Sequence, residues 1–324
     1  MIAGMRVRNV MALVVGAVTV CAACGGGSRA GSGSSSAPSG PIAATIPVGD
    51  AGGAVAVGFG SVWVANSADG SVSRIDPVAA KVVATIRVGS APFGVAAGEG
   101  AVWVTNQDDD SPSRIDPATN RVAQTIPVGM LPIGVGVTPG AVWVADHHGD
   151  SVVRVDPKTN RVVKTVSVGS TPIGGPAHMA SGAGSVWVGV PDIGAVVRID
   201  AAANSVRSAK VASGGLCGDL ALARDAVWVA GGGCAVGIAR VDPSTRKTVA
   251  TLVGGDEVAG LALGGGGLWY TTLEGNVVGR IDTATNTVVA RVKVPGTPRS
   301  LAVGFGSVWV ADPALRAVLE LTPN

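Results

Sequence analysis

All seven tryptophans of this chain lie in copies of one short motif, and the copies recur at a nearly constant interval. The successive intervals are 40, 40, 44, 41, 41 and 40 residues. The motif reads SVWVAN, AVWVTN or a close variant, with its tryptophan at Trp63, Trp103, Trp143, Trp187, Trp228, Trp269 and Trp309. Each unit contains four short β-like runs separated by turns rich in glycine, proline and asparagine. A period of about 40 residues with four strands per unit is typical of a β-propeller blade.

The number of strands predicts how the ring closes. The last unit ends after its third strand, at AVLELTPN, whereas the repeats begin with an unpartnered outer strand, ATIPVG at 44–49. We therefore predict an all-β fold over residues 41–324: a seven-bladed β-propeller with four-stranded blades. The N-terminal strand joins the C-terminal blade and removes the last open sheet edge. Pro47 and Pro127 fall in outer strands of this interpretation, where a missing N–H is tolerated.

Two repeated side chains have a structural interpretation. One tryptophan per blade at the same strand position is expected to pack between blades. An Arg-x-Asp sequence ends the third strand of six units, as in Arg74 and Asp76, and both residues change together in the last unit, to Glu320 and Thr322. Residues two apart in a strand share a face, so we expect these side chains to pair within or between blades.

The segment VWVTN…RIDPATNRVAQTIPVGMLPIGVGV closely resembles the YVTN-family β-propellers. The units resemble, more loosely, the PxGI…LWFTE…IGRIT repeats of the virginiamycin B lyase family. Both resemblances cover residues 41–323 and imply the propeller fold. They imply little about function, because the shared residues are the ones that build blades.

The resemblance to the lyases also implies where catalytic residues would lie. The lyase histidines follow the proline of PxGI, and the matching residues here are Phe93, Ile133, Ala177, Arg299, Gly53, Gly218 and Ala259. The glutamate of WFTE is matched by Asn66, Asn106, Asp146, Val190, Gly231, Thr272 and Asp312. No histidine and no glutamate occupies these positions, and the chain offers no other nucleophile and base. We therefore favour a protein without enzymatic activity.

The first 40 residues have the composition of an export signal and a tether. Arg6 and Arg8 precede an apolar run at 10–20 that is too short to span a bilayer. Ala22 and Ala23 stand directly before Cys24, as in the lipobox of a bacterial lipoprotein. We predict a lipoprotein signal peptide at 1–23, lipidation of Cys24, and a Gly/Ser-rich tether at 24–40. The alternative is an ordinary cleaved signal peptide.

The net charge of the chain without its predicted signal peptide limits the classes of partner that it can bind. Removal of residues 1–23 takes two arginines from the 24 basic residues, which leaves 22 against 22 acidic ones and a formal net charge of zero. A neutral chain lacks the basic surface that nucleic acid requires, so no nucleic-acid partner is expected.

Cys217 and Cys234 would meet an oxidising compartment after export, and both fall in loops on one face of one blade. We predict a disulfide between them.

The loops that follow the second and fourth strands vary and should share one face of the ring, here called the top face. Thirteen acidic residues map to these loops: Asp50, Asp69, Asp108, Asp109, Asp110, Asp146, Asp150, Asp192, Asp219, Asp256, Glu257, Glu274 and Asp312. Only Arg299 is expected squarely among them, with Arg87 and Lys293 near the rim. An electronegative top face follows, with Asp108, Asp109 and Asp110 as candidate binding residues.

The three histidines of the chain are predicted to converge on one sector of the top face. His147 and His148 follow Trp143 closely, flanked by Asp146 and Asp150, and His178 lies in the loop that enters the next unit. These residues are candidate ligands for a divalent metal or a cationic molecule. The alternative is that they are ordinary solvent-exposed loop residues.

These observations favour an exported, lipid-anchored, monomeric propeller that acts as a binding or scaffold module. The partner would be an envelope protein or a small cationic ligand, the lipid anchor would be the sole membrane contact, and no cofactor beyond the candidate divalent metal is expected. The alternative function is a metal-dependent enzyme of lyase or hydrolase type that uses the histidine sector.

Overall fold

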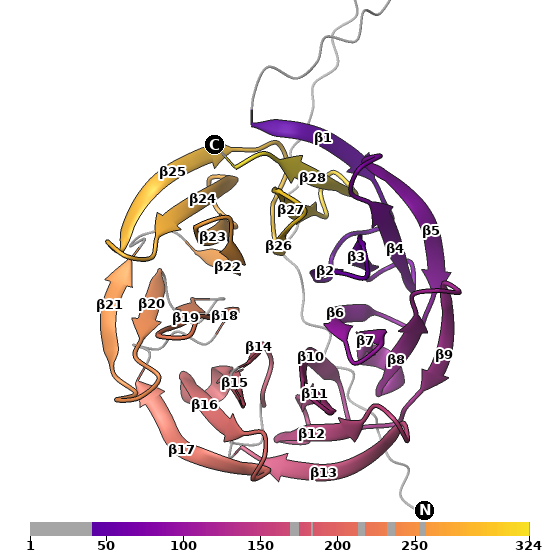
Figure 1. Ribbon diagram of the computed structural model, residues 1–324, viewed down its shortest axis with the longest axis vertical. Coiled ribbons are helices and arrows are strands. Elements are labelled where there is room, and N and C mark those ends of the chain that lie inside the picture. The colour runs from indigo at the N-terminus through magenta and orange to yellow at the C-terminus, as the bar shows by residue number, and fades with distance from the viewer. Residues whose placement is uncertain are drawn as a thin grey trace, which may run out of the picture. The chain divides into compact units, whose positions relative to one another are not determined.

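The computed structural model describes residues 41–168, 175–182, 184–212, 218–231, 237–252 and 257–323. Their strands form seven four-stranded antiparallel sheets, arranged as blades around a central opening (Figure 1). The predicted seven-bladed β-propeller is therefore confirmed. Cys24, the tether, Cys217 and Cys234 lie outside the described residues, so their predicted roles stay predictions.

Each of the first six blades takes its strands consecutively along the chain. Blade 1 consists of β2 (Val55–Gly58), β3 (Ser61–Asn66), β4 (Ser71–Asp76) and β5 (Lys81–Arg87). Blade 2 consists of β6 (Pro92–Gly98), β7 (Ala101–Asn106), β8 (Ser111–Asp116) and β9 (Arg121–Thr125). Blade 3 consists of β10 (Pro132–Thr138), β11 (Ala141–Asp146), β12 (Ser151–Asp156) and β13 (Arg161–Ser167).

The remaining blades repeat this order until the ring closes. Blade 4 consists of β14 (Met179–Gly182), β15 (Ser185–Val190), β16 (Ala195–Asp200) and β17 (Ser205–Ala212). Blade 5 consists of β18 (Leu220–Leu222), β19 (Val227–Ala230), β20 (Ile238–Val241) and β21 (Thr248–Leu252). Blade 6 consists of β22 (Val258–Gly264), β23 (Gly267–Thr272), β24 (Val277–Asp282) and β25 (Thr287–Lys293). Blade 7 consists of β26 (Leu301–Gly304), β27 (Ser307–Asp312), β28 (Ala317–Leu321) and β1 (Ile42–Pro47).

The predicted closure of the ring is confirmed by the pairing of β1 with β28. The two strands run antiparallel, with Thr45 opposite Leu319 and Ile46 opposite Val318. Pro47 is the last residue of β1, on the outer edge, as expected. Pro127 lies just beyond the end of β9 rather than inside it, because proline has no N–H for the ladder.

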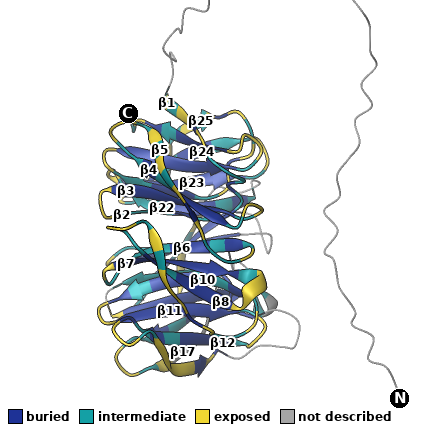
Figure 2. Ribbon diagram, turned by 90° about the vertical axis from the view of Figure 1, so that its right-hand side faces the viewer, coloured by how far each residue is buried: buried dark blue, intermediate teal, exposed yellow. Residues whose placement is uncertain are grey.

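The core lies between blades, and its buried segments are dark blue in Figure 2. All seven tryptophans are buried in it. Trp63 packs with Val102 and Val104 of blade 2, and Trp187 packs with Val227 and Val229 of blade 5. In five blades the indole N–H also donates to an acceptor five residues earlier, at 2.9–3.2 Å. The tryptophans therefore have the structural role that the sequence predicted.

In blade 1 the two charged residues of the Arg-x-Asp sequence contact different partners. The Arg74 guanidinium lies 5.0 Å from the centre of the Trp63 ring and donates to Asn120 Oδ1 of blade 2 at 2.7 Å. Asp76 instead accepts the N–H of Val78 at 2.8 Å, within its own turn. The arginine therefore bridges two blades, whereas the aspartate caps the β4–β5 turn.

Besides the strands, the described residues contain two short 3-10 helices, η1 (Gln107–Asp109) and η2 (Pro191–Ile193). Among the described residues there is no helix with the length and apolar character that crossing a membrane requires. The loops after the second and fourth strands of each blade form the top face, and the turns after the first and third strands form the opposite, bottom face.

Candidate functional site

One position in each blade, within or just before the first residues of the innermost strand, is small in five blades. By strand register, this inner position is held by Ala54, Gly94, Gly134, Gly260 and Ser300. A Cβ on Gly94 would lie 2.5 Å from Ile133 O, and one on Gly260 would lie 2.4 Å from Arg299 O. Because the next blade comes this close, side chains are excluded at these two positions.

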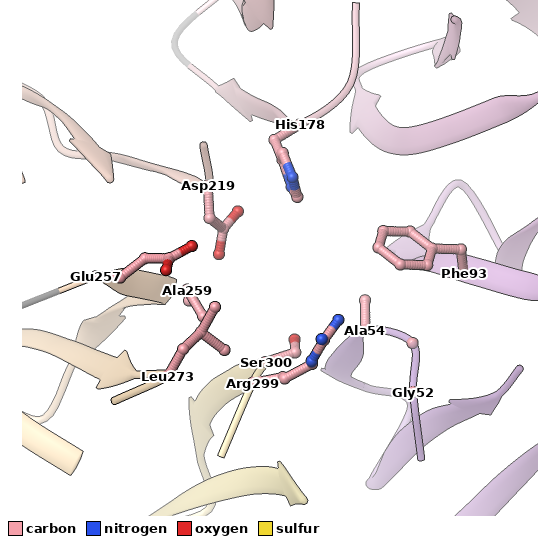
Figure 3. A pocket seen from close by; sticks show the side chains of 12 residues that line it. Gly52, Ala54, Phe93, His178, Asp219, Glu257, Ala259, Leu273, Arg299 and Ser300 are labelled. Atoms are coloured by element: carbon pink, nitrogen blue, oxygen red, sulfur yellow. The ribbon is translucent and has the colours of Figure 1, made fainter. Parts of the chain in front are cut away.

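Blades 4 and 5 break this pattern with the only two titratable residues at the inner position. By the same register, His178 precedes Met179 of β14 and Asp219 precedes Leu220 of β18. Two neighbouring blades thus direct an imidazole and a carboxylate into space that the other blades leave to small residues (Figure 3). The inner position of blades 4 and 5 therefore departs from the repeat.

A pocket of about 220 Å³ lies at this end of the central opening. Its polar side chains are His178, Asp219, Glu257, Arg299 and Ser300, and its apolar wall includes Phe93, Ala259 and Leu273. These residues come from five blades and project toward one another in Figure 3. Glu257 and Arg299 form no side-chain hydrogen bond or ion pair with any residue that the structure describes, so both charged groups are available to a ligand.

Asp219 is held rigidly by two backbone donors. Its Oδ1 accepts the N–H of Leu220 and its Oδ2 accepts the N–H of Leu261 in blade 6, each at 2.9 Å. Ser300 makes the equivalent contact between blades 7 and 1, where its Oγ accepts the N–H of Val55 at 3.1 Å. Asp219 therefore joins blades 5 and 6, and its carboxylate oxygens retain lone pairs that face the pocket.

The environment of Asp219 favours its neutral form. The residue keeps some solvent exposure at the pocket wall, but its carboxyl group is enclosed by protein. Burial therefore raises the pKa of Asp219, and this effect exceeds the opposing influence of His178 and of the two backbone hydrogen bonds. A buried carboxyl with a raised pKa in a cleft is a common property of functional sites.

His178 also contacts the aromatic wall of the pocket. Its ring centroid lies 6.5 Å from that of Phe93, in an edge-to-face arrangement with an interplanar angle of 61°. Its backbone is fixed by Gly189, whose N–H donates to the His178 carbonyl at 2.9 Å. His178 is thus placed between an apolar surface and a carboxylate.

The other two histidines belong to a separate cluster in the loop between β11 and β12. The rings of His147 and His148 lie 5.3 Å apart, and His147 Nδ1 is 3.3 Å from the carbonyl oxygen of Pro176. This loop therefore contacts the segment that leads to His178. Across the described residues, however, no three His, Cys, Asp or Glu side chains are grouped as a metal ion requires. A divalent metal at these histidines stays a prediction.

Several acidic residues predicted for the top face fix loops instead of standing free. Asp146 is 6% exposed, and its Oδ1 accepts the N–H of Met130 at 2.8 Å and that of Gly149 at 3.1 Å. Asp109 accepts the N–H of Ser90 at 2.7 Å, and Asp110 accepts that of Leu131 at 3.0 Å. Asp109 and Asp146 thus connect the loop after the second strand to the loop that enters the same blade, and Asp110 connects it to the loop that enters the next blade.

Two further predicted residues lie in the same loops. Asp108 is exposed in η1 and makes no side-chain hydrogen bond with a described residue, whereas Asp150 has a left-handed backbone, with φ of 53°, at the end of its turn. The expectation that Arg299 alone would stand among the top-face acids was wrong. Arg316, in the loop between β27 and β28, also lies there and forms an ion pair with Asp69 at 3.1 Å.

The grouping of His178, Asp219, Glu257 and Arg299 was missed by the sequence analysis. Each residue had been assigned to the top face, but His178 had been placed with His147 and His148. The signal that could have found the group is the alignment of all seven inner positions, in which His178 and Asp219 stand out against small residues.

Comparison with known proteins defines the fold. No protein-family model and no curated protein sequence matches the chain. Among solved structures, virginiamycin B lyase from Staphylococcus aureus is 16% identical with a TM-score of 0.75, covering 87% of this chain and 99% of that chain. A catalytically inactive variant of that lyase with quinupristin is 18% identical with a TM-score of 0.72, covering 86% of this chain and 96% of that chain.

A second kind of structural neighbour is the hydrazine synthase of Kuenenia stuttgartiensis. It is 17% identical with a TM-score of 0.71, and the match covers 90% of this chain and 98% of that chain. At these identities the likeness shows the fold alone. The class of protein is thus a seven-bladed β-propeller repeat protein, a fold compatible with a binding or scaffold module.

Proposed function

We propose that this protein is a binding module whose ligand is a small organic zwitterion held in the central pocket. The single observation that carries the proposal is the pocket at the inner position, where the side chains of Arg299 and Glu257 have no hydrogen-bond or ion-pair partner among the described residues and Asp219 is enclosed. Small-ligand sites are concave and largely apolar, with a few converging polar groups. This pocket meets that description.

The lining residues specify the ligand class. Asp219 and Glu257 favour an ammonium group, and the Arg299 guanidinium matches a carboxylate through paired hydrogen bonds. Phe93 and Leu273 offer contact to an apolar or aromatic body. An aromatic amino acid is the simplest molecule with all three features, so it is the first probe.

Protonation links binding to pH. An ammonium group next to Asp219 favours the ionised carboxylate, so binding releases a proton wherever Asp219 is protonated in the free protein. Affinity should therefore rise with pH through the raised pKa of Asp219. A ligand that carried only a carboxylate would not show this dependence through Asp219.

The experiment compares three probes by isothermal titration calorimetry. Phenylalanine carries both charges, phenethylamine only the ammonium, and hydrocinnamate only the carboxylate. We expect phenylalanine to bind most tightly, and Asp219→Asn and Arg299→Gln each to weaken it by about tenfold, the loss of one charged hydrogen bond. Asp108→Asn removes an exposed charge outside the pocket and should change nothing.

Equal affinity for the three probes, or unchanged phenylalanine binding in both pocket variants, would contradict the zwitterion proposal. If no probe binds, the protein can be incubated with an envelope extract from which macromolecules have been removed. Mass spectrometry of the recovered protein would then show whether any small molecule occupies the pocket. An empty pocket after that step would refute a small-ligand function.

We propose also that the module is exported and lipid-anchored. The support is the sequence at 1–40: two arginines, a short apolar run, and Ala22 and Ala23 before Cys24. Cys24→Ala should leave the precursor uncleaved or release the protein from the membrane fraction, whereas Cys21→Ala should not. Processed, membrane-bound Cys24→Ala protein would exclude Cys24 as the anchor.

A second candidate function is that of a lyase, favoured by the placement of Asp219 and His178 in the lining of one pocket in a fold similar to that of a lyase. A carboxylate can orient a histidine for proton abstraction. Incubation with quinupristin, the molecule seen with the inactive lyase variant, followed by mass spectrometry tests this idea. Intact quinupristin after prolonged incubation would leave the binding module as the better function.

A further inference from the structure

On the bottom face, the boundary between blades 4 and 5 lacks a bridge that three other boundaries have. At regular boundaries the arginine of one blade donates to an asparagine in the last turn of the next, as Arg114 does to Asn160 at 2.9 Å and Arg240 does to Asn286 at 3.0 Å. At the boundary of blades 4 and 5, Arg246 occupies the asparagine position, with the same left-handed backbone at φ of 61°. The regular bridge therefore cannot form there.

Loss of the bridge leaves donors unused. Arg198 donates through Nε to Ser185 Oγ at 3.0 Å and through Nη1 to the carbonyl oxygen of Pro243 at the long distance of 3.4 Å, whereas its Nη2 has no acceptor among the described residues. The indole N–H of Trp187 donates to no acceptor among the described residues, as is also true of Trp228, whereas the other five tryptophans donate to an atom five residues earlier. A cavity of about 240 Å³ lies at this point, and both side chains line it.

A second arginine enters the same cavity from the first turn of blade 5. The corresponding turns of other blades are built from glycines, as in GFG and GEG, but blade 5 has Arg224 and Asp225. Arg224 is exposed, lines the cavity and has no ion-pair partner in the described part of the chain, because Asp225 binds Arg240 at 2.9 Å.

The electrostatics of this cavity favour an anion. Two guanidinium groups and an indole N–H line it, and its lining contains no carboxylate. The nearest acid of the adjoining turn, Asp242, already accepts the backbone N–H and the hydroxyl of Ser244 at 2.7 and 2.6 Å. Donors from several directions suit a tetrahedral oxyanion better than a planar carboxylate, which one arginine can satisfy.

We propose that the cavity between blades 4 and 5 binds the phosphate or sulfate group of a ligand through Arg198, Arg224 and the Trp187 indole N–H. The site lies on the bottom face and is independent of the central pocket. Its volume exceeds that of a bare oxyanion, so it can also admit part of the molecule that carries the group.

Calorimetric titration of the purified propeller with inorganic phosphate, sulfate and acetate, at constant ionic strength in chloride, tests the proposal. We expect saturable one-to-one binding of phosphate or sulfate, and the tighter of the two identifies the group. Arg224→Gln, an exposed position that the fold does not need, should weaken binding by about tenfold. Arg161→Gln removes an exposed cation of the bottom face outside the cavity and is the matched control.

A second variant restores the regular boundary. Arg246→Asn places the residue that the backbone favours within reach of Arg198, so it should close the cavity, raise Tm and abolish phosphate binding. Wild-type affinity in a stabilised Arg246→Asn protein would overturn the proposal. Acetate binding as tight as phosphate binding would also overturn the proposal, and so would equal losses of affinity in Arg224→Gln and Arg161→Gln. Loss of phosphate binding in Arg299→Gln would overturn it too, because that result would assign the anion to the central pocket.

Discussion

At the scale of single residues, the repeat is held by side chains that act in sets. The arginine of the third strand covers the tryptophan of the second strand in six blades, with distances of 5.0–5.7 Å to the ring centre. Its bridge to the next blade needs an asparagine in that blade's turn. Blade 1 has Ala80 at the asparagine position, and blade 7, which precedes it in the ring, has Glu320 in place of the arginine. Glu320 Oε1 accepts the Ser307 hydroxyl at 2.7 Å. The two departures are thus coupled.

Ala80 is the residue whose replacement should stabilise the fold. Its φ is +46°, a left-handed conformation that costs alanine about 1 kcal/mol and that asparagine adopts more readily. We expect Ala80→Asn to raise the free energy of unfolding by about 0.5–1 kcal/mol, measured by urea denaturation. Val78→Asn in the same turn, at a position that is 93% exposed, should have little effect. A destabilised Ala80→Asn protein would show that the alanine methyl matters more than the backbone.

At the scale of elements, the turns between third and fourth strands are capped by aspartates. The pKa values of Asp76, Asp116, Asp156, Asp242 and Asp282 are lowered by hydrogen bonds from residues two and three positions ahead. At Asp242 the Ser244 hydroxyl is the main cause, and the pKa falls to about 2. The ionised carboxylate is thus the form that stabilises each hairpin.

These turns should make the propeller sensitive to acid. Because the pKa of each of these aspartates is lower in the folded state, the ionised carboxylate contributes its full stabilisation above the unfolded-state pKa of 3.8. This stabilisation is lost as pH falls through the folded-state pKa, which is about 2 for Asp242. We expect the urea midpoint to fall steeply between these two pH values. Asp242→Asn should reduce the fall, and Asp108→Asn should not. Asp219 acts in the opposite sense, because its raised pKa means that ionisation on going up in pH costs stability.

At the scale of the whole molecule, the ring is closed by one strand from the far end of the chain. β1 supplies the outer edge of blade 7, and Ile46 is buried with Val62 and Val64 of blade 1. Closure therefore links the last blade to the first through both strand pairing and packing, which leaves the ring without an open blade.

Deletion of residues 41–49 should therefore destabilise the entire ring. We expect a loss of several kcal/mol from strand pairing and apolar burial, seen as a large fall in Tm by calorimetry. Deletion of the nine residues 29–37, within the predicted tether, serves as the control for chain length and should leave Tm unchanged. Similar Tm values for the two deletions would mean that the pairing of β1 contributes little.

The fold could be predicted from the sequence because its determinants are local and repeated. Alternating apolar residues, a tryptophan every 40 to 44 positions, a last unit without its fourth strand and an unpartnered strand before the first unit predicted a closed ring of seven blades. The burial of Trp63 and its equivalents, and the pairing of β1 with β28, followed from the same periodicity. These properties depend on the order of residues within a unit, which the sequence displays directly.

The candidate site depended on the tertiary structure, because its residues are brought together only when the ring closes. His178 and Asp219 lie 41 positions apart, and Arg299 is 80 positions further on. Loop assignment placed His178 beside His147, but strand register directs it to the central pocket with Asp219. Likewise, Asp146 and Asp109 seemed free acids until the backbone donors of neighbouring loops were located. Which charges are satisfied by neighbouring blades, and which remain for a ligand, is set by contacts between blades that no single repeat contains.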